Sequence, residues 1–156
     1  MNIPEQFKKI EYIIIISVLM IIPLVLINMG DSDVKFCRSV LNGLIQGRAS
    51  VSKHIDWENL SIMNLDAGAA YKKLPNDKEK KDYQQAFIKN FSLAFKKLGA
   101  NINMFVNWKV YGISNNKITV SALDRKHNVP LYLQINKGAG GKKLVSLTRM
   151  PNINEK

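Results

Sequence analysis

The stretch from Tyr12 to Met29 is the feature that most constrains what this chain can become. These 18 residues carry no charge and are interrupted only by Ser17, Pro23 and Asn28. As a helix they would extend about 27 Å at about 1.5 Å per residue, close to the roughly 30 Å hydrocarbon core of a bilayer. The stretch therefore predicts a transmembrane helix over residues 12–29.

We expect this span to stay attached as a signal anchor. A cleaved secretory signal needs small residues before the cut, whereas this span ends in Ile27-Asn28-Met29-Gly30. Lys8 and Lys9 precede the span and give a small excess of positive charge on that side. The positive-inside rule therefore places residues 1–11 in the cytoplasm as a short tail. The sequence thus predicts a single-pass protein of the inner (cytoplasmic) membrane, with its C-terminal domain in the periplasm or outside the cell.

The rest of the chain is long enough for one domain. Removing 30 residues from 156 leaves 126, which suits one compact domain and is too short for two. This length excludes a large multidomain enzyme and a polytopic transporter. We expect a soluble α+β domain over residues 34–150 and a flexible tail over residues 151–156.

The charge of the chain is strongly positive. It has 23 Lys and Arg against 12 Asp and Glu, a formal net charge of +11. Such an excess attracts polyanions, such as anionic phospholipid, an acidic partner protein or, as a weaker alternative, nucleic acid. The alternative interpretation is a solvated basic face. The candidate contacts to an anionic surface are Lys89, Lys96, Lys97, Lys142 and Lys143.

Few side chains suit catalysis or metal binding. One cysteine and two histidines exclude a disulfide framework and a cysteine-rich zinc module. The glycine-rich loop before Lys142 is not a P-loop, because Lys143 stands where Ser or Thr is needed. Asp124, Arg125 and His127 lie in a predicted hairpin turn, so we interpret them as turn residues rather than an acid–base cluster. We predict a non-enzymatic protein with no catalytic residue, no cofactor and no metal.

Apolar residues at helical spacing predict helices in the first part of the domain. The longest begins after Asn76, which forms a capping-box pattern with Glu79, and stops at Gly99. Asp56 is a plausible N-cap for a short helix that carries Trp57, Leu60 and Met63. The other expected helices cover residues 34–48 and 67–74.

After Gly99 the period of the apolar residues changes from helical to alternating. The alternation predicts four strands joined by short turns, at residues 102–110, 118–122, 131–135 and 144–150. Strands connected in this way pair as a four-stranded antiparallel meander. N-terminal helices packed on such a sheet give an α+β fold.

The long helix carries a stripe of aromatic side chains that has two interpretations. They either form core or line an apolar cleft between helix and sheet, and both interpretations can hold at different ends of the stripe. The cleft residues would be Tyr83, Phe87, Phe91, Phe95 and Trp108.

The layout of one span, N-terminal helices and an antiparallel sheet resembles the cystatin-like or nuclear-transport-factor-two-like superfamily. The order of short tail, span and domain is similar to that of the inner-membrane scaffold proteins of type IV secretion systems. The stretch from His54 to Leu98, with IDWENL followed by AAYKKLPNDKEKKDYQQAFIKNF, resembles the periplasmic phospholipid-carrier (toluene-tolerance) proteins. The resemblance covers the middle third of the chain and carries over no individual binding residue.

Three functions remain open at this stage. The first is a structural subunit of a bacterial envelope or secretion complex, which assembles through protein–protein contacts with other envelope proteins or as a homo-oligomer. The second is a membrane-tethered lipid-binding module that uses the aromatic cleft. The third is a small enzyme of the same fold. The first is our prediction, because the anchor, the small size and the missing catalytic residues all fit it.

Overall fold

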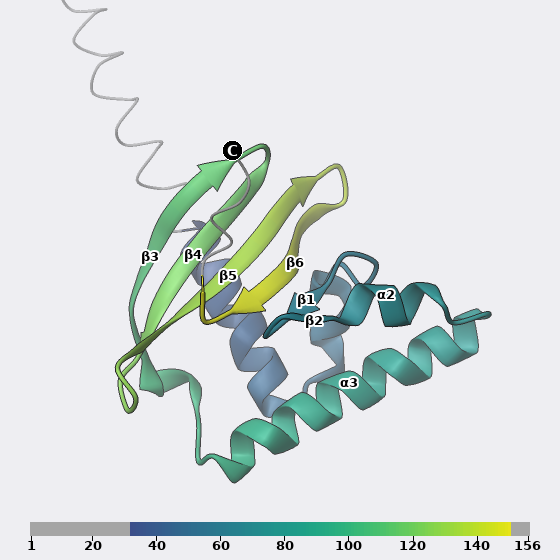
Figure 1. Cartoon of the computed structure of the whole chain (residues 1–156), viewed down its shortest axis with the longest axis horizontal. Coiled ribbons are helices and arrows are strands. Elements are labelled where there is room, and N and C mark those ends of the chain that lie inside the picture. Colours follow the sequence, from purple (N-terminus) through teal and green to yellow (C-terminus); the bar gives the residue numbers. More distant parts are fainter. Residues whose placement is uncertain (1–31, 151–156) are drawn as a thin grey trace, which may run out of the picture. The chain divides into compact units, whose positions relative to one another are not determined.

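The computed structural model describes residues 32–150 (Figure 1). The predicted cytoplasmic tail, the span at residues 12–29 and the tail at residues 151–156 lie outside the described residues. Within residues 32–150, every helix is too short or too polar to cross a membrane.

Helices come first in the domain, and most of the sheet follows. A helix over residues 32–46 leads the described part of the chain, in agreement with the prediction for residues 34–48. The later elements are η1 (Ala49–His54), β1 (Ser61–Ile62), β2 (Leu65–Asp66), α2 (Ala67–Lys72), α3 (Asp77–Lys97), η2 (Ile102–Met104), β3 (Phe105–Ser114), β4 (Lys117–Asp124), β5 (Val129–Gly138) and β6 (Gly141–Thr148).

The prediction of a four-stranded antiparallel sheet is wrong. The sheet has six strands in the order β2-β1-β6-β5-β4-β3 and is mixed, because β1 runs parallel to β6. The meander from β3 to β6 is antiparallel as expected. The missed strands, β1 and β2, have two residues each, which is too short for an alternating pattern to be recognised.

The expected helix after Asp56 is replaced by turns and by β1. The backbone N–H of Asp56 donates to Leu144 O over 2.9 Å, and that of Met63 donates to Leu147 O over 2.7 Å. Pairing with β6 therefore draws this segment into the sheet. A local cap and a few apolar residues do not outweigh such tertiary hydrogen bonds.

The first strand of the meander begins later than predicted. Residues Ile102–Met104 form the 3-10 turn η2, where the side chain of Asn101 accepts a hydrogen bond from the N–H of Asn103 over 2.9 Å. Short polar side chains that bond nearby backbone favour such turns over strands. The strand β3 therefore starts at Phe105.

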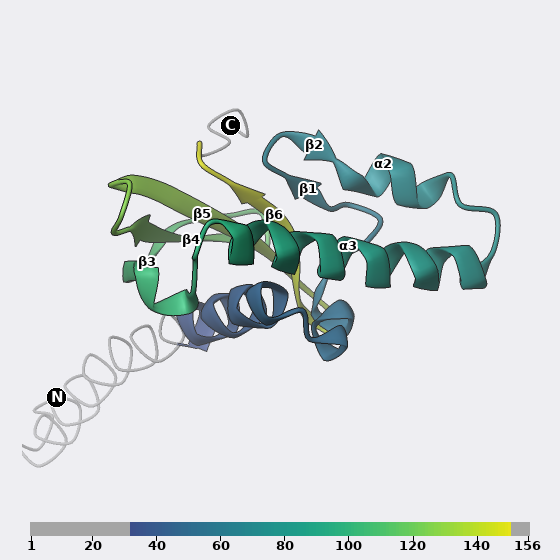
Figure 2. The ribbon, with the colours of Figure 1, turned by 90° about the horizontal axis from the view of Figure 1, so that it is seen from below.

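The core lies between the sheet and the helix over residues 32–46. That helix buries Cys37, Leu41 and Leu44 completely, and the sheet contributes Leu133 and Leu147, which are also fully buried. Figure 2 shows this helix and α3 running beside each other next to the sheet. The hydroxyl of Ser92 on α3 donates to Ile45 O over 2.8 Å and joins the two helices.

The long helix α3 begins as predicted. The side-chain oxygen of Asn76 accepts from the N–H of Glu79 over 2.9 Å, while the Asn76 amide donates to the Glu79 carboxylate over 3.0 Å. These reciprocal bonds satisfy backbone donors that a helix start otherwise leaves unpaired. At the other end, Gly99 has a φ of +64°, the left-handed conformation that ends helices.

Candidate ligand-binding site

An apolar pocket of about 380 Å³ lies where the end of α3 meets the sheet. Its walls come from the end of α3, from the connection into β3, from the β4–β5 turn with the start of β5, from Met63 after β1, and from Arg149 after β6. The apolar lining includes Phe95, Leu98, Met104, Phe105, Val129 and Leu131. This volume falls in the range of about 300–1,000 Å³ that is typical of small-molecule sites.

The end of α3 shapes one wall of the pocket. The left-handed Gly99 reverses the chain, and the N–H of Ala100 donates to Phe95 O over 2.9 Å. The 3-10 turn that follows brings the chain back to Phe105, which is buried and whose ring centroid lies 6.4 Å from that of Phe95. The side chain of Leu98, just after α3, remains exposed at the pocket, with 61% of its surface accessible.

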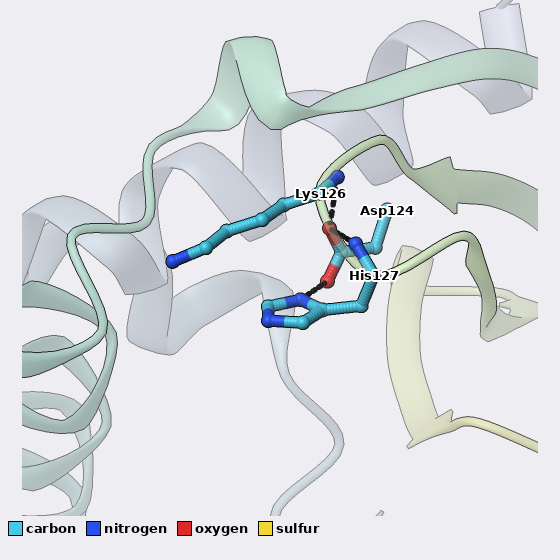
Figure 3. A network of polar contacts seen from close by, with 3 residues as sticks. All are labelled: Asp124, Lys126 and His127. Atoms are coloured by element: carbon cyan, nitrogen blue, oxygen red, sulfur yellow. Dashed lines mark hydrogen bonds and ion pairs between the residues drawn. The ribbon is translucent and has the colours of Figure 1, made fainter.

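A carboxylate–imidazole pair also lines the pocket (Figure 3). The Nδ1 atom of His127 lies 2.8 Å from Oδ2 of Asp124. The other carboxylate oxygen accepts the backbone N–H groups of Lys126, over 3.0 Å, and of His127, over 3.3 Å. Asp124 is thus a turn residue, as the sequence suggested, and the same turn places its carboxylate and the imidazole at the pocket.

Two opposing effects set the pKa of Asp124. Burial by itself raises the pKa of the carboxyl group, because it disfavours the charged form. The hydrogen bonds donated by the His127 ring and by the backbone N–H groups of His127 and Lys126 outweigh burial, so the pKa is lowered below its ordinary value. The carboxylate is therefore charged at neutral pH and is already satisfied by donors from its own turn.

The third polar residue that lines the pocket is Arg149, just beyond the end of β6. Its side chain is exposed and makes neither an ion pair nor a hydrogen bond with any residue from 32 to 150. Nε2 of His127 is likewise without a hydrogen-bond partner in that range. The polar side of the pocket thus offers a cation and a ring nitrogen to a ligand.

A second apolar pocket, of about 400 Å³, follows along α3 toward its N-terminal end. Its lining residues are Ile62, Tyr83, Ala86, Phe87, Asn90 and Phe91. The two pockets use consecutive residues of the chain, Ile62 and Met63, and consecutive rings of the aromatic stripe, Phe91 and Phe95. Those two rings stack with their centroids 4.7 Å apart.

The predicted cleft residues are thus divided between two pockets. Tyr83, Phe87 and Phe91 line the second pocket, and Phe95 lines the first. Trp108 lines neither of them; it is partly buried on β3, and its indole N–H donates to Phe105 O over 2.8 Å. The hydroxyl of Tyr83 donates to Ala67 O over 3.1 Å, and burial and the charge of Asp66 raise the pKa of this tyrosine.

The predicted basic contacts have different surroundings. Lys89, Lys96 and Lys97 are exposed on α3, and Lys143 is exposed on β6. Lys142 instead lies 2.6 Å from Oδ1 of Asp33, a buried carboxylate whose Oδ2 lies 3.1 Å from Lys137 Nζ. This triad ties the start of the first described helix to β5 and β6.

The polar residues of the first pocket were missed as a group by the sequence reading. Asp124 and His127 were read only as turn formers, and Arg149 was not singled out. Their meeting depends on the pairing of β4 with β5 and of β5 with β6, which brings residues separated along the chain to one end of the sheet. The spacing of these residues along the sequence does not indicate that they meet.

No His, Cys, Asp and Glu cluster suited to a metal ion occurs among residues 32–150. The chain was also compared with protein-family models, curated proteins and solved structures, and none of them matches.

Proposed function

We propose that this chain is a membrane-anchored binding module that holds an amphiphilic ligand in the first pocket, beside Arg149. The observation that carries the proposal is the pocket itself, an apolar space of about 380 Å³ with a few polar residues in its lining. Apolar walls with a small number of placed polar groups are the usual construction of small-molecule sites. The anchor is the span predicted at residues 12–29, which would keep the module beside a source of amphiphiles.

Two features favour ligand binding over catalysis at this site. The Asp124 carboxylate already accepts three hydrogen bonds from its own turn, and its pKa is lowered, whereas a general acid or base is usually tuned toward neutral pH. The pocket's apolar side is made by α3 and by the strands, which can enclose a hydrocarbon chain. The expectation of a non-enzymatic protein is therefore kept as part of the proposal.

The second candidate is the envelope-complex subunit predicted from the sequence. It is favoured by the exposed apolar side chains on β3, an edge strand of the sheet, where Tyr111 is 54% and Ile113 is 72% accessible. Edge strands with exposed apolar side chains pair readily with other chains. A subunit of this kind would bind another envelope protein, or a second copy of itself, along β3.

Native mass spectrometry of the full-length chain, extracted from its own membrane in mild detergent, separates the two candidates. We expect a lipid-sized mass on the wild-type chain and on Ala94→Trp, which changes an exposed α3 position outside both pockets. Ala100→Trp fills the first pocket and should lose that mass. Added protein masses in fixed ratio, without a small ligand, would favour the envelope subunit, and a bare wild-type chain would contradict both candidates.

A further inference from the structure

We infer that the ligand is a single-chain amphiphile with an anionic head group, held head-first by Arg149 in the first pocket, with its chain running along α3 toward Tyr83. The inference rests on the proposed function and names the class of ligand. Carboxylate and phosphate heads share the required chemistry, because both present anionic oxygens to a guanidinium in a bidentate geometry.

The head group is assigned by the polar side of the first pocket. Its one carboxylate, Asp124, is occupied by His127 and by two backbone N–H groups. The guanidinium of Arg149 and Nε2 of His127 have no partner within the described part of the chain. Because the Asp124 carboxylate is already paired, Arg149 is the charged side chain among the lining residues that is left for a ligand, and it is complementary to an anionic head.

The path of the chain is assigned by the adjacency of the two pockets, whose lining residues are neighbours along the chain. The first pocket ends at Phe95 and Met63, and the second begins at the neighbouring Phe91 and Ile62. Along α3, the 12 residues from Phe95 back to Tyr83 extend about 18 Å at about 1.5 Å per residue. The two pockets therefore form successive parts of one apolar track rather than two sites side by side.

A single chain fits this arrangement better than two. The first pocket, about 380 Å³, is near the lower end of the range of small-molecule sites, and the second, about 400 Å³, is lined by the preceding turns of the same helix. A lipid with two chains would need a space of double width next to its head group. Both pockets are lined by the aromatic stripe on one face of α3.

Photolabelling of the full-length chain in lipid nanodiscs tests the orientation of the ligand. Two palmitate analogues are used, one with a diazirine next to the carboxylate and one with a diazirine at the end of the chain. The first should label Met104 or Leu98, which line the first pocket, and the second should label Phe87 or Phe91. Terminal labelling that avoids α3 would overturn the assigned path.

Two matched pairs of variants test the two ends of the track. Ala86→Trp obstructs the second pocket and should abolish terminal labelling of α3, whereas Ala94→Trp on the same helix should preserve it. Arg149→Gln removes the ion pair with the head group. It should raise the probe concentration needed for equal labelling about fivefold, which corresponds to the strongest exposed ion pairs. Arg125→Gln removes an exposed arginine that does not line the pocket, and it should leave labelling unchanged.

Competition separates failure of this inference from failure of the proposed function. Palmitate or lysophosphatidate should displace the probe, and the stronger competitor identifies the head as carboxylate or phosphate. Cetyl alcohol and phosphatidylglycerol should displace the probe at least about fivefold less well. Cetyl alcohol has no charge for Arg149, and the second chain of phosphatidylglycerol does not fit the track. If cetyl alcohol or phosphatidylglycerol competes as well as palmitate does, the inference is overturned, but the pocket remains a ligand site. Absence of labelling in the first pocket would overturn the proposed function as well.

Discussion

The Nζ atom of Lys142 lies 2.6 Å from Oδ1 of Asp33, a carboxylate that is almost completely buried. Asp33 stands at the start of the first described helix, four positions after the end of the predicted span, and Lys142 stands on β6. The contact therefore joins the segment next to the predicted membrane anchor to the sheet. Lys137, at 3.1 Å from Oδ2, adds a second cation to the same carboxylate.

Asp33→Asn should destabilise the domain by about 2 kcal/mol, because it leaves two partly buried ammonium groups without their anion. Asp82→Asn is the matched control, since Asp82 is exposed on α3 and has no ion pair within the described range. Chemical unfolding followed by tryptophan fluorescence measures both free energies. An equal stability of the Asp33 variant and the wild type would show that the ion pairs contribute nothing.

The thiol of Cys37 should be unreactive in the folded protein. Burial, followed by the nearby charge of Asp33, raises the pKa of Cys37 to about 12, although Lys142 acts in the opposite direction. Because the thiolate is the reactive form, a maleimide should modify Cys37 at least about a hundredfold more slowly than an exposed thiol. Ser50→Cys in a Cys37→Ser background supplies that exposed thiol. Rapid native labelling of Cys37 would show that the first described helix does not pack as described.

The Asp124 turn should make stability depend on pH in the acid range. Its pKa is lowered in the folded state, so the unfolded chain binds the proton more tightly, and folding is favoured while the carboxylate is charged. This contribution is present above the ordinary pKa of 3.8 and is lost as pH falls through the lower folded value. Asp124→Asn should cost about 1 kcal/mol at neutral pH.

The comparison of unfolding free energies at neutral and acid pH checks this prediction. The difference between wild type and Asp124→Asn should shrink as the pH falls below 3.8. Arg125→Gln, in the same turn, should give a difference that does not depend on pH in this way. A difference for Asp124→Asn that stays constant down to strong acid would refute the assigned pairing with His127.

The cap of α3 should contribute measurably to stability. Asn76→Ala removes the acceptor of the Glu79 N–H and the donor to the Glu79 carboxylate, at a cost of about 1 kcal/mol. Gln85→Ala, at an exposed position of the same helix, should change stability little. Thermal unfolding measures the stability of both variants. If Asn76→Ala loses no more stability than Gln85→Ala, the start of the helix is held by packing alone.

Local patterns in the sequence predict those parts of the fold whose causes are local. The start of α3 depends on Asn76 and Glu79, three positions apart, and the turn at Asn115 and Asn116 uses left-handed residues that asparagine tolerates. The strands β4 and β5 alternate over long enough runs to be recognised, and most of β6 falls within the strand predicted at residues 144–150. These elements were correctly predicted.

The parts of the fold that the sequence did not predict depend on contacts between residues far apart along the chain. β1 exists because Ser61 and Ile62 pair with Ser146 and Leu147, more than eighty positions away, so two residues without a pattern become a strand. The first pocket likewise needs the turn at His127 and the end of β6 at Arg149 to meet the end of α3. The sequence singles out the stripe from Tyr83 to Phe95, but the division of that stripe between two pockets depends on β1 and its turn.

The most direct test of the central claim places a photoreactive phenylalanine at Leu98, on the margin of the first pocket, in the full-length chain in living cells. Irradiation should add the mass of one amphiphile to the chain, and the same residue at the exposed position Asp82 should add none. That pair of results is what an anchored amphiphile-binding module predicts. An adduct at Leu98 that consists only of another protein, or no adduct at all, would contradict it.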